Sequence, residues 1–274
     1  MKKYFEYIGL IALTLFSFYY TDKVTKIMNS KDPVMISIKE YKDKTKESCK
    51  EGYYTNDGVI LGVNGKIVDV NESYSNMVSK GYDEELMVFE EVLCKVNKED
   101  NLENYIIKGN EVKNSVSLFI EIKDLNYIDD IISISKNQNI KLNILVNGRI
   151  LENNKEKFEN IYKEGIDIIY NGNKLEDIEK YINIMKSISN DKRLLCVSYN
   201  NIDNLDICKS KKINTIKTNY VFDKSIYNNT KTNLEKDAFY IYKENSQLLN
   251  EFNTIINHIK GKNIDIISAI EMIK

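Results

Sequence analysis

The chain has 274 residues, and its 39 basic and 41 acidic side chains give a formal net charge of −2. Such a near-neutral chain lacks the strong positive field that attracts nucleic acid, so we expect no nucleic-acid partner. Its length suits one large domain with an appendage.

The first 22 residues predict a membrane anchor. Lys2 and Lys3 precede an apolar run over residues 4–20, interrupted near its start by Glu6. About 17 apolar residues is the lower limit for a spanning helix, and the two lysines favour a cytoplasmic N-terminus. Aromatic residues end the run where a signal-peptidase site would need small ones. We expect a single-pass signal-anchor in the cell membrane with the rest of the chain extracellular; a cleaved signal peptide and a buried soluble helix are the alternatives.

Four cysteines leave the redox state open. An extracellular location permits disulfides. Cys196 and Cys208 are twelve residues apart, with a predicted strand and helix between them, and Cys49 and Cys94 both lie in the N-terminal third. The sequence does not decide whether either pair is bonded. We favour buried or free thiols, because a domain of this size does not need disulfides.

Residues 23–112 predict a small region of mixed α and β structure that begins with a helix. Asp32 is a suitable N-cap, and Pro33 stands in the first turn, where its missing N–H is harmless. Val34, Ile38 and Tyr41 then recur on one helical face.

Shorter elements follow in the same region. Asn64-Gly65 between two apolar runs predicts a β-hairpin with a type I′ turn. A short helix ends at Gly81, and residues 105–110 are expected to be extended.

Residues 113–274 alternate strand-like and helical segments. The predicted strands are 116–122, 141–146, 166–170, 194–199, 213–218, 238–242 and 264–267, and the predicted helices are 126–138, 154–165, 174–189 and 246–262. This alternation indicates an α/β fold with a parallel sheet. We expect a small β/α barrel, closed or incomplete, with a doubly wound open sheet as the alternative. In either fold, ligands bind at the carboxyl ends of the strands.

The stretch "VSLFIEIKD" resembles the first strand of NodB-type polysaccharide deacetylases, which ends in T-F-D-D-G. The resemblance places Glu121 at the position of the base and Ile122 at that of a metal-binding carboxylate. The stretch "ILVNGRILENN" is similar to the family pattern F-x-x-G-x-x-x-x-x-N, with Gly148 and either Asn153 or Asn154 as the matching residues.

Later stretches continue the resemblance without the family's catalytic groups. "GIDIIYNGNKL" puts Asn171 and Leu175 where the family has two metal-ligating histidines. "LLCVSYNNID" keeps only Tyr199 of the motif R-P-P-Y-G, and "AFYIYKE" lacks the histidine that acts as general acid. The resemblance therefore implies a deacetylase-type barrel, and we expect no catalytic residue, metal or cofactor in it.

The N-terminal region also resembles a segment that precedes degenerate deacetylase-like domains in membrane-anchored proteins of low-GC Gram-positive bacteria. The matching residues are Gly62, Asn64, Gly65, Val68, Asp69, Ser73, Tyr74, Met77 and Gly81. With this match we expect three parts: an anchor over 1–22, an α+β region over 23–112 and the barrel over 113–274.

The residues alone also disfavour a hydrolytic metal centre, which needs several converging ligands. The single histidine, His258, falls within a predicted helix. An all-carboxylate site of Glu121, Asp124 and Asp167 for Mg²⁺ or Ca²⁺ is the alternative.

Three tyrosines are candidates for stacking on a sugar, namely Tyr199, Tyr220 and Tyr242. The favoured hypothesis is a membrane-anchored extracellular pseudoenzyme that binds cell-wall glycan or an envelope protein. An active deacetylase with atypical ligands and a structural or assembly module are the alternatives.

Overall fold

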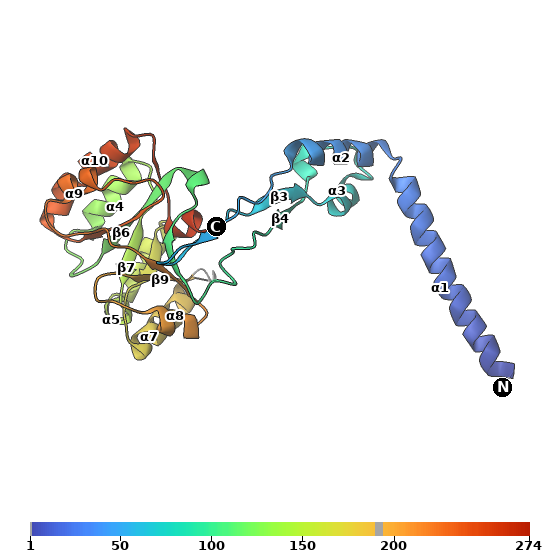
Figure 1. The fold of residues 1–274 in the computed structure, drawn as a ribbon, viewed down its shortest axis with the longest axis horizontal. Helices are drawn as coiled ribbons and strands as arrows, with labels where there is room; N and C mark the ends of the chain where they lie inside the picture. Colours follow the sequence, from blue (N-terminus) through green and yellow to red (C-terminus); the bar gives the residue numbers. More distant parts are fainter. Residues whose placement is uncertain (1, 190–193) are drawn as a thin grey trace. The chain divides into compact units, whose positions relative to one another are not determined.

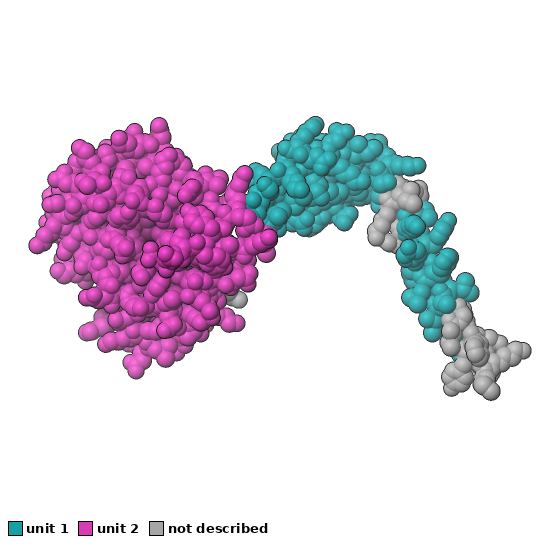
Figure 2. Space-filling model, viewed as in Figure 1, with its two compact units in different colours: residues 1–49, 65–92 teal, residues 50–64, 93–274 magenta. Residues whose placement is uncertain are grey.

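The structure, a computed structural model, describes residues 2–189 and 194–274. The chain forms two compact units, which Figure 2 shows in different colours. Unit 1 consists of residues 1–49 and 65–92, and unit 2 consists of residues 50–64 and 93–274. The division differs from the expected boundary near residue 112, because two segments before it supply strands to the sheet of unit 2.

Helix α1 (Lys2–Asn29) contains the expected apolar run. Among the side chains of α1 that the structure describes, the large apolar ones that are exposed are Tyr7, Ile11, Leu13, Leu15, Phe16, Phe18, Tyr19, Tyr20 and Val24. Among the described residues, no helix combines the length and apolarity that crossing a membrane requires.

The rest of unit 1 packs helices on a two-stranded antiparallel sheet. Helix α2 (Pro33–Thr45) begins as predicted, since Asp32 accepts a hydrogen bond of 2.8 Å from the backbone N–H of Val34. The other elements are β3 (Gly65–Val68), α3 (Val70–Met77), η1 (Glu84–Leu86) and β4 (Phe89–Val92). Their small core consists of Ile38, Val68, Met77 and Met87.

The predicted hairpin at Asn64-Gly65 is wrong. Strand β3 pairs with β4, whereas β2 (Val59–Ile60) belongs to unit 2. Gly65 does not have the positive φ that a type I′ turn requires. Instead it allows close backbone packing, because a Cβ there would lie 2.2 Å from the carbonyl oxygen of Glu47.

Unit 2 is built on an 11-stranded sheet with the order β1-β2-β5-β10-β9-β8-β7-β6-β12-β11, and β13 pairs with β6. Figure 1 labels β6, β7 and β9 of this sheet. The pairs are parallel except for β1 with β2. The strands are β1 (Tyr53–Tyr54), β2, β5 (Tyr105–Lys108), β6 (Ser115–Glu121), β7 (Asn143–Val146), β8 (Asp167–Tyr170), β9 (Leu195–Ser198), β10 (Asn214–Lys217), β11 (Val221–Phe222), β12 (Phe239–Lys243) and β13 (Asp265–Ile266).

All seven strands predicted after residue 113 are confirmed, with ends shifted by one or two residues. The helices are η2 (Glu111–Lys113), α4 (Ile128–Asn137), α5 (Gly148–Asn153), α6 (Lys155–Lys163), α7 (Leu175–Ile188), α8 (Leu205–Ser210), α9 (Ile226–Thr232), α10 (Ser246–Lys260) and α11 (Ala269–Met272). Within the described ranges no pairing joins β11 to β1, so the sheet is a curled half-barrel and the incomplete form of the expected barrel is the one observed.

The two faces of this sheet bury different side chains. Alternate residues of a strand point to opposite faces. On β6, Leu118 and Ile120 belong to the core beneath the helices, here called the helix-side core. Phe119 belongs to the core inside the half-barrel, here called the inner core. The inner core continues onto α11 through Met272.

The expectation of free cysteines is wrong, because none of the described cysteines is free. Cys196 and Cys208 form a disulfide. Helix α8 follows β9 after a short loop and returns toward β10, the strand beside β9, which brings the two Cα atoms to 6.5 Å. Both residues are fully buried in the helix-side core.

Candidate functional site

Strand alternation places four polar side chains at the carboxyl edge of the half-barrel. Phe119, Ile169, Val197 and Ile241 belong to the inner core, and two residues beyond each of them stand Glu121, Asn171, Tyr199 and Lys243. Because side chains two apart share a face, these four continue the inner face beyond its apolar layer.

A chain of hydrogen bonds joins three of these groups. The Asn171 Nδ2 donates to the hydroxyl of Tyr199 over 3.1 Å, and that hydroxyl donates to Glu121 Oε1 over 2.5 Å. Asn171 and Tyr199 are buried. Burial, reinforced by the negative charge of Glu121, raises the pKa of Tyr199, so the hydroxyl stays protonated and keeps donating.

The other carboxylate oxygen of Glu121 is differently placed. Glu121 Oε2 is buried and has no hydrogen-bond partner, and Lys243 Nζ lies 3.9 Å from it. That separation makes an ion pair but is too long for a hydrogen bond. The two residues face each other in register on the neighbouring strands β6 and β12.

The family's metal does not fit the residues at the positions that the resemblance assigns. Ile122 is 4% exposed and packs in the helix-side core, and Leu175 is the first residue of α7 with 51% of its surface exposed. Neither side chain has a lone pair for a metal. The amide nitrogen of Asn171 donates a hydrogen bond to the hydroxyl of Tyr199.

The alternative carboxylate site is not formed either. Asp167 begins β8 and lies level with Phe119 through Asn143 on β7, so it is two residues short of Glu121 along the strand direction and two strands away from it. Asp124 is exposed and accepts a hydrogen bond from the backbone N–H of Asn126. Within the described part of the chain, these three carboxylates do not lie close enough together to hold one metal ion.

Two of the three candidate stacking tyrosines do not face the site. Tyr242 is fully buried in the helix-side core, where its hydroxyl lies 3.1 Å from Thr230 Oγ1. Tyr220 packs against the same core, and its ring stacks on that of Tyr240 with centroids 5.1 Å apart. Both expectations are wrong, because these side chains point to the face that the helices cover. Tyr199 alone of the three lies at the site.

His258 has the packing position that its sequence context predicts. It lies in α10 and meets the ring of Tyr227 edge-on, with centroids 5.9 Å apart.

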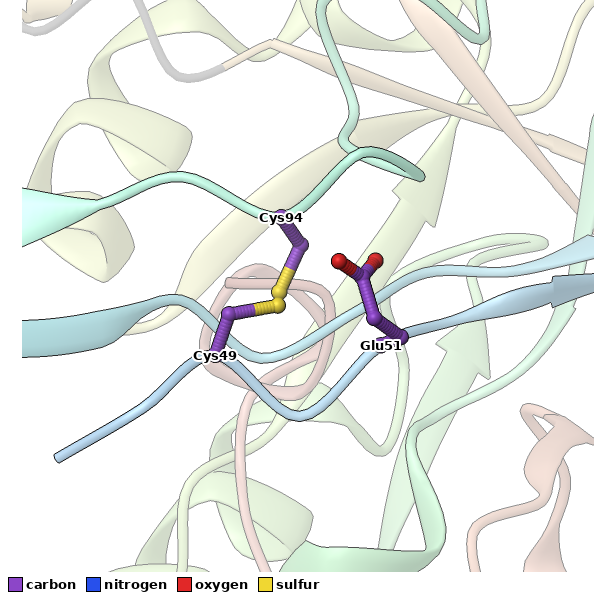
Figure 3. Close-up of side chains that lie close together, drawn as sticks. All are labelled: Cys49, Glu51 and Cys94. Atoms are coloured by element: carbon purple, nitrogen blue, oxygen red, sulfur yellow. The ribbon is translucent and has the colours of Figure 1, made fainter.

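Figure 3 shows another group with metal-ligand chemistry, formed by Cys49, Glu51 and Cys94. Both cysteines are disulfide-bonded. A disulfide sulfur is not the thiolate that binds metals, so this group is not a metal site.

Sequence reasoning missed Glu244, which organises the loop beside Glu121. Glu244 is 4% exposed. Its Oε2 accepts backbone N–H groups of Lys123, Asp124 and Leu125 at 3.1, 3.3 and 3.1 Å, and its Oε1 accepts that of Tyr127 at 2.9 Å. Glu244, which directly follows strand β12, therefore caps the start of helix α4. Sequence reasoning also missed Lys243. Its position two residues after Ile241 places it on the same face of the strand and could have identified it.

No protein-family profile matches the sequence, and no curated protein matches it. Solved structures do match the fold. BA3943 from Bacillus anthracis, described as a CE4 family pseudoenzyme, has a TM-score of 0.64 and 18% identity over 89% of this chain and 96% of that chain. A BA3943 mutant described as having restored enzymatic activity has a TM-score of 0.63 and 18% identity, over 89% of this chain and 98% of that one.

A peptidoglycan N-acetylglucosamine deacetylase, Bc1960, has a TM-score of 0.54 and 17% identity, over 61% of this chain and 92% of that chain. At these identities the likeness concerns the fold. The chain therefore has the fold of the CE4, or NodB-type, polysaccharide deacetylases, as the sequence resemblance implied.

Proposed function

We propose that the chain is an exported, membrane-anchored protein whose deacetylase-like domain binds cell-wall glycan, or a partner in the cell envelope, without hydrolysing it. One observation carries the proposal. Where the family resemblance requires metal ligands, Ile122 is packed in the core and Leu175 offers only a hydrocarbon side chain. A metal that activates water needs about three protein ligands.

The remaining polar groups suit binding rather than hydrolysis. Glu121 is held by Tyr199 and paired with Lys243. A carboxylate without an electrophile or an oxyanion donor supplies little of the barrier reduction that amide hydrolysis requires. The same groups offer hydrogen-bond acceptors and donors at a strand edge, where α/β folds bind ligands.

Two observations support export and anchoring. The Cys196–Cys208 disulfide favours an oxidising compartment. Helix α1 exposes apolar side chains from Ile11 to Tyr20, which suits a lipid environment.

The test is metal analysis of the purified full-length protein, combined with acetate-release and binding assays on chitin oligomers and peptidoglycan. We expect no stoichiometric metal and no acetate, together with retention of the protein on insoluble peptidoglycan. Tyr199→Phe should weaken retention, because it removes the hydroxyl that fixes Glu121. Tyr53→Phe, which changes an exposed tyrosine on β1, is the control.

Other outcomes would favour the alternatives. Stoichiometric zinc, nickel or cobalt with acetate release that Glu121→Gln abolishes would identify an active deacetylase. A protein that neither releases acetate nor binds any glycan would fit a structural or assembly module.

A further inference from the structure

The Glu121–Lys243 pair contains an acceptor that lacks a donor. Glu121 Oε2 is buried without a hydrogen-bond partner. A buried carboxylate oxygen in this state loses hydration that nothing in the protein replaces, so a group that donates to it is strongly favoured.

The carboxylate cannot easily turn to improve its contacts. Its other oxygen is held by the Tyr199 hydroxyl, which is itself held by Asn171. The orientation of Oε2 toward Lys243 is therefore set by three strands of the sheet.

The spacing of the pair fits one bridging oxygen. Lys243 Nζ and Glu121 Oε2 are 3.9 Å apart. An oxygen about 2.8 Å from each atom would subtend an angle of roughly 90°, which is acceptable for a hydroxyl that accepts from one and donates to the other. The Lys243 side chain is 39% exposed on a flexible stem, so a small shift of it opens access to Oε2.

Hydrogen-bonding capacity and charge together decide which ligand groups fit between the two side chains. The pair is neutral as a whole, with one ammonium and one carboxylate. At the bridging position a ligand ammonium has no lone pair to accept from Lys243 and is repelled by it, whereas an ionised carboxylate has no proton to donate to Glu121 and is repelled by it. A neutral hydroxyl accepts from Lys243 and donates to Glu121 without either repulsion.

We infer that Glu121 and Lys243 together recognise a single hydroxyl group of a neutral saccharide and discriminate against cationic and anionic ones. This inference rests on the proposed glycan binding and specifies its chemistry.

The experiment measures affinities of the purified full-length protein for a neutral chitin oligosaccharide and for its fully deacetylated, cationic counterpart. The wild type should prefer the neutral probe. Lys243→Met should weaken binding of the neutral probe by about tenfold or more, since a charge-assisted hydrogen bond is lost. The same variant should bind the cationic probe more tightly, because the repelling charge is gone. A merely structural role for Lys243 would weaken both.

Glu121→Gln is the second variant and should weaken binding of the neutral probe by a similar factor. Lys108→Met is the matched control, because Lys108 is 40% exposed and is also ion-paired, with Glu235. It should leave both affinities unchanged, and thermal unfolding of each variant checks that it is folded.

Two results overturn the inference and are distinguishable. If the wild type binds the neutral probe but Lys243→Met and Glu121→Gln bind it equally well, the hydroxyl-recognition pair is wrong and glycan binding stands. If the wild type binds neither probe, both the pair and the proposed glycan binding are wrong.

Discussion

Replacing Glu244 by Gln should strongly destabilise unit 2. Four backbone N–H groups converge on this buried carboxylate. An amide has one acceptor oxygen, and its NH₂ group cannot accept. With that oxygen placed at Oε2, three hydrogen bonds lose their charge assistance and the N–H of Tyr127 loses its acceptor.

The magnitude follows from these losses. Each retained bond weakens by roughly 1 kcal/mol, and an unsatisfied buried donor costs about 1–3 kcal/mol. Since such terms are not additive, we expect a loss of about 3–5 kcal/mol in the free energy of unfolding. At about 2–4 °C per kcal/mol, the melting temperature should fall by roughly 6–20 °C.

The assay is thermal and urea unfolding followed by circular dichroism, with Asp177→Asn as the comparison. Asp177 also caps a helix from a distance, but it accepts only two backbone N–H groups, from Gly148 at 2.9 Å and Arg149 at 3.0 Å, and it is less buried. We expect this variant to lose about 1–2 kcal/mol. If Glu244→Gln loses no more than Asp177→Asn, the capping argument is refuted.

Three further predictions concern the core, the orientation and the alkaline stability. Leu118→Asp and Ile120→Asp would each bury an unpaired carboxylate beneath the helices and should cost about 3–5 kcal/mol; unchanged melting of both would contradict their placement. Protease added to intact protoplasts should remove most of the protein, whereas digestion only after lysis would show that the proposed orientation is wrong. Burial raises the pKa of Tyr105 and Tyr220 from 10.0 to about 12, so their stabilising contribution is present below pH 10 and is lost as the pH rises toward 12. Urea unfolding across this pH range should show falling stability, and a flat profile would contradict the burial of these hydroxyls.

The parallel strands could be predicted because each is a short apolar run. Strand β6 buries six consecutive side chains before Glu121, a pattern typical of a strand covered on both faces. Three of the described strands escaped prediction. Strands β1 and β11 have two residues each, which is too short for a periodic pattern, and β4 pairs with β3, more than twenty residues earlier in the chain.

The site was only partly predictable from the sequence. Glu121, Asn171 and Tyr199 were named through the family resemblance, and strand alternation alone would have added Lys243. Asp167 could have been excluded, because a residue at the start of a parallel strand lies away from the carboxyl edge. Glu244 could not be recognised, because its role depends on a loop that is about 120 residues earlier in the chain.

The pairing of β5 with β10 affects the order in which unit 2 can fold. Tyr105 and Ile106 lie beside Thr215 and Ile216, on the order of 100 residues later in the chain. At translation rates of roughly 5–20 residues per second, β5 emerges about 5–20 s before its partner. During that interval the edge of β5 that will pair with β10 has no strand beside it, and a chaperone has time to keep this edge from pairing with other chains.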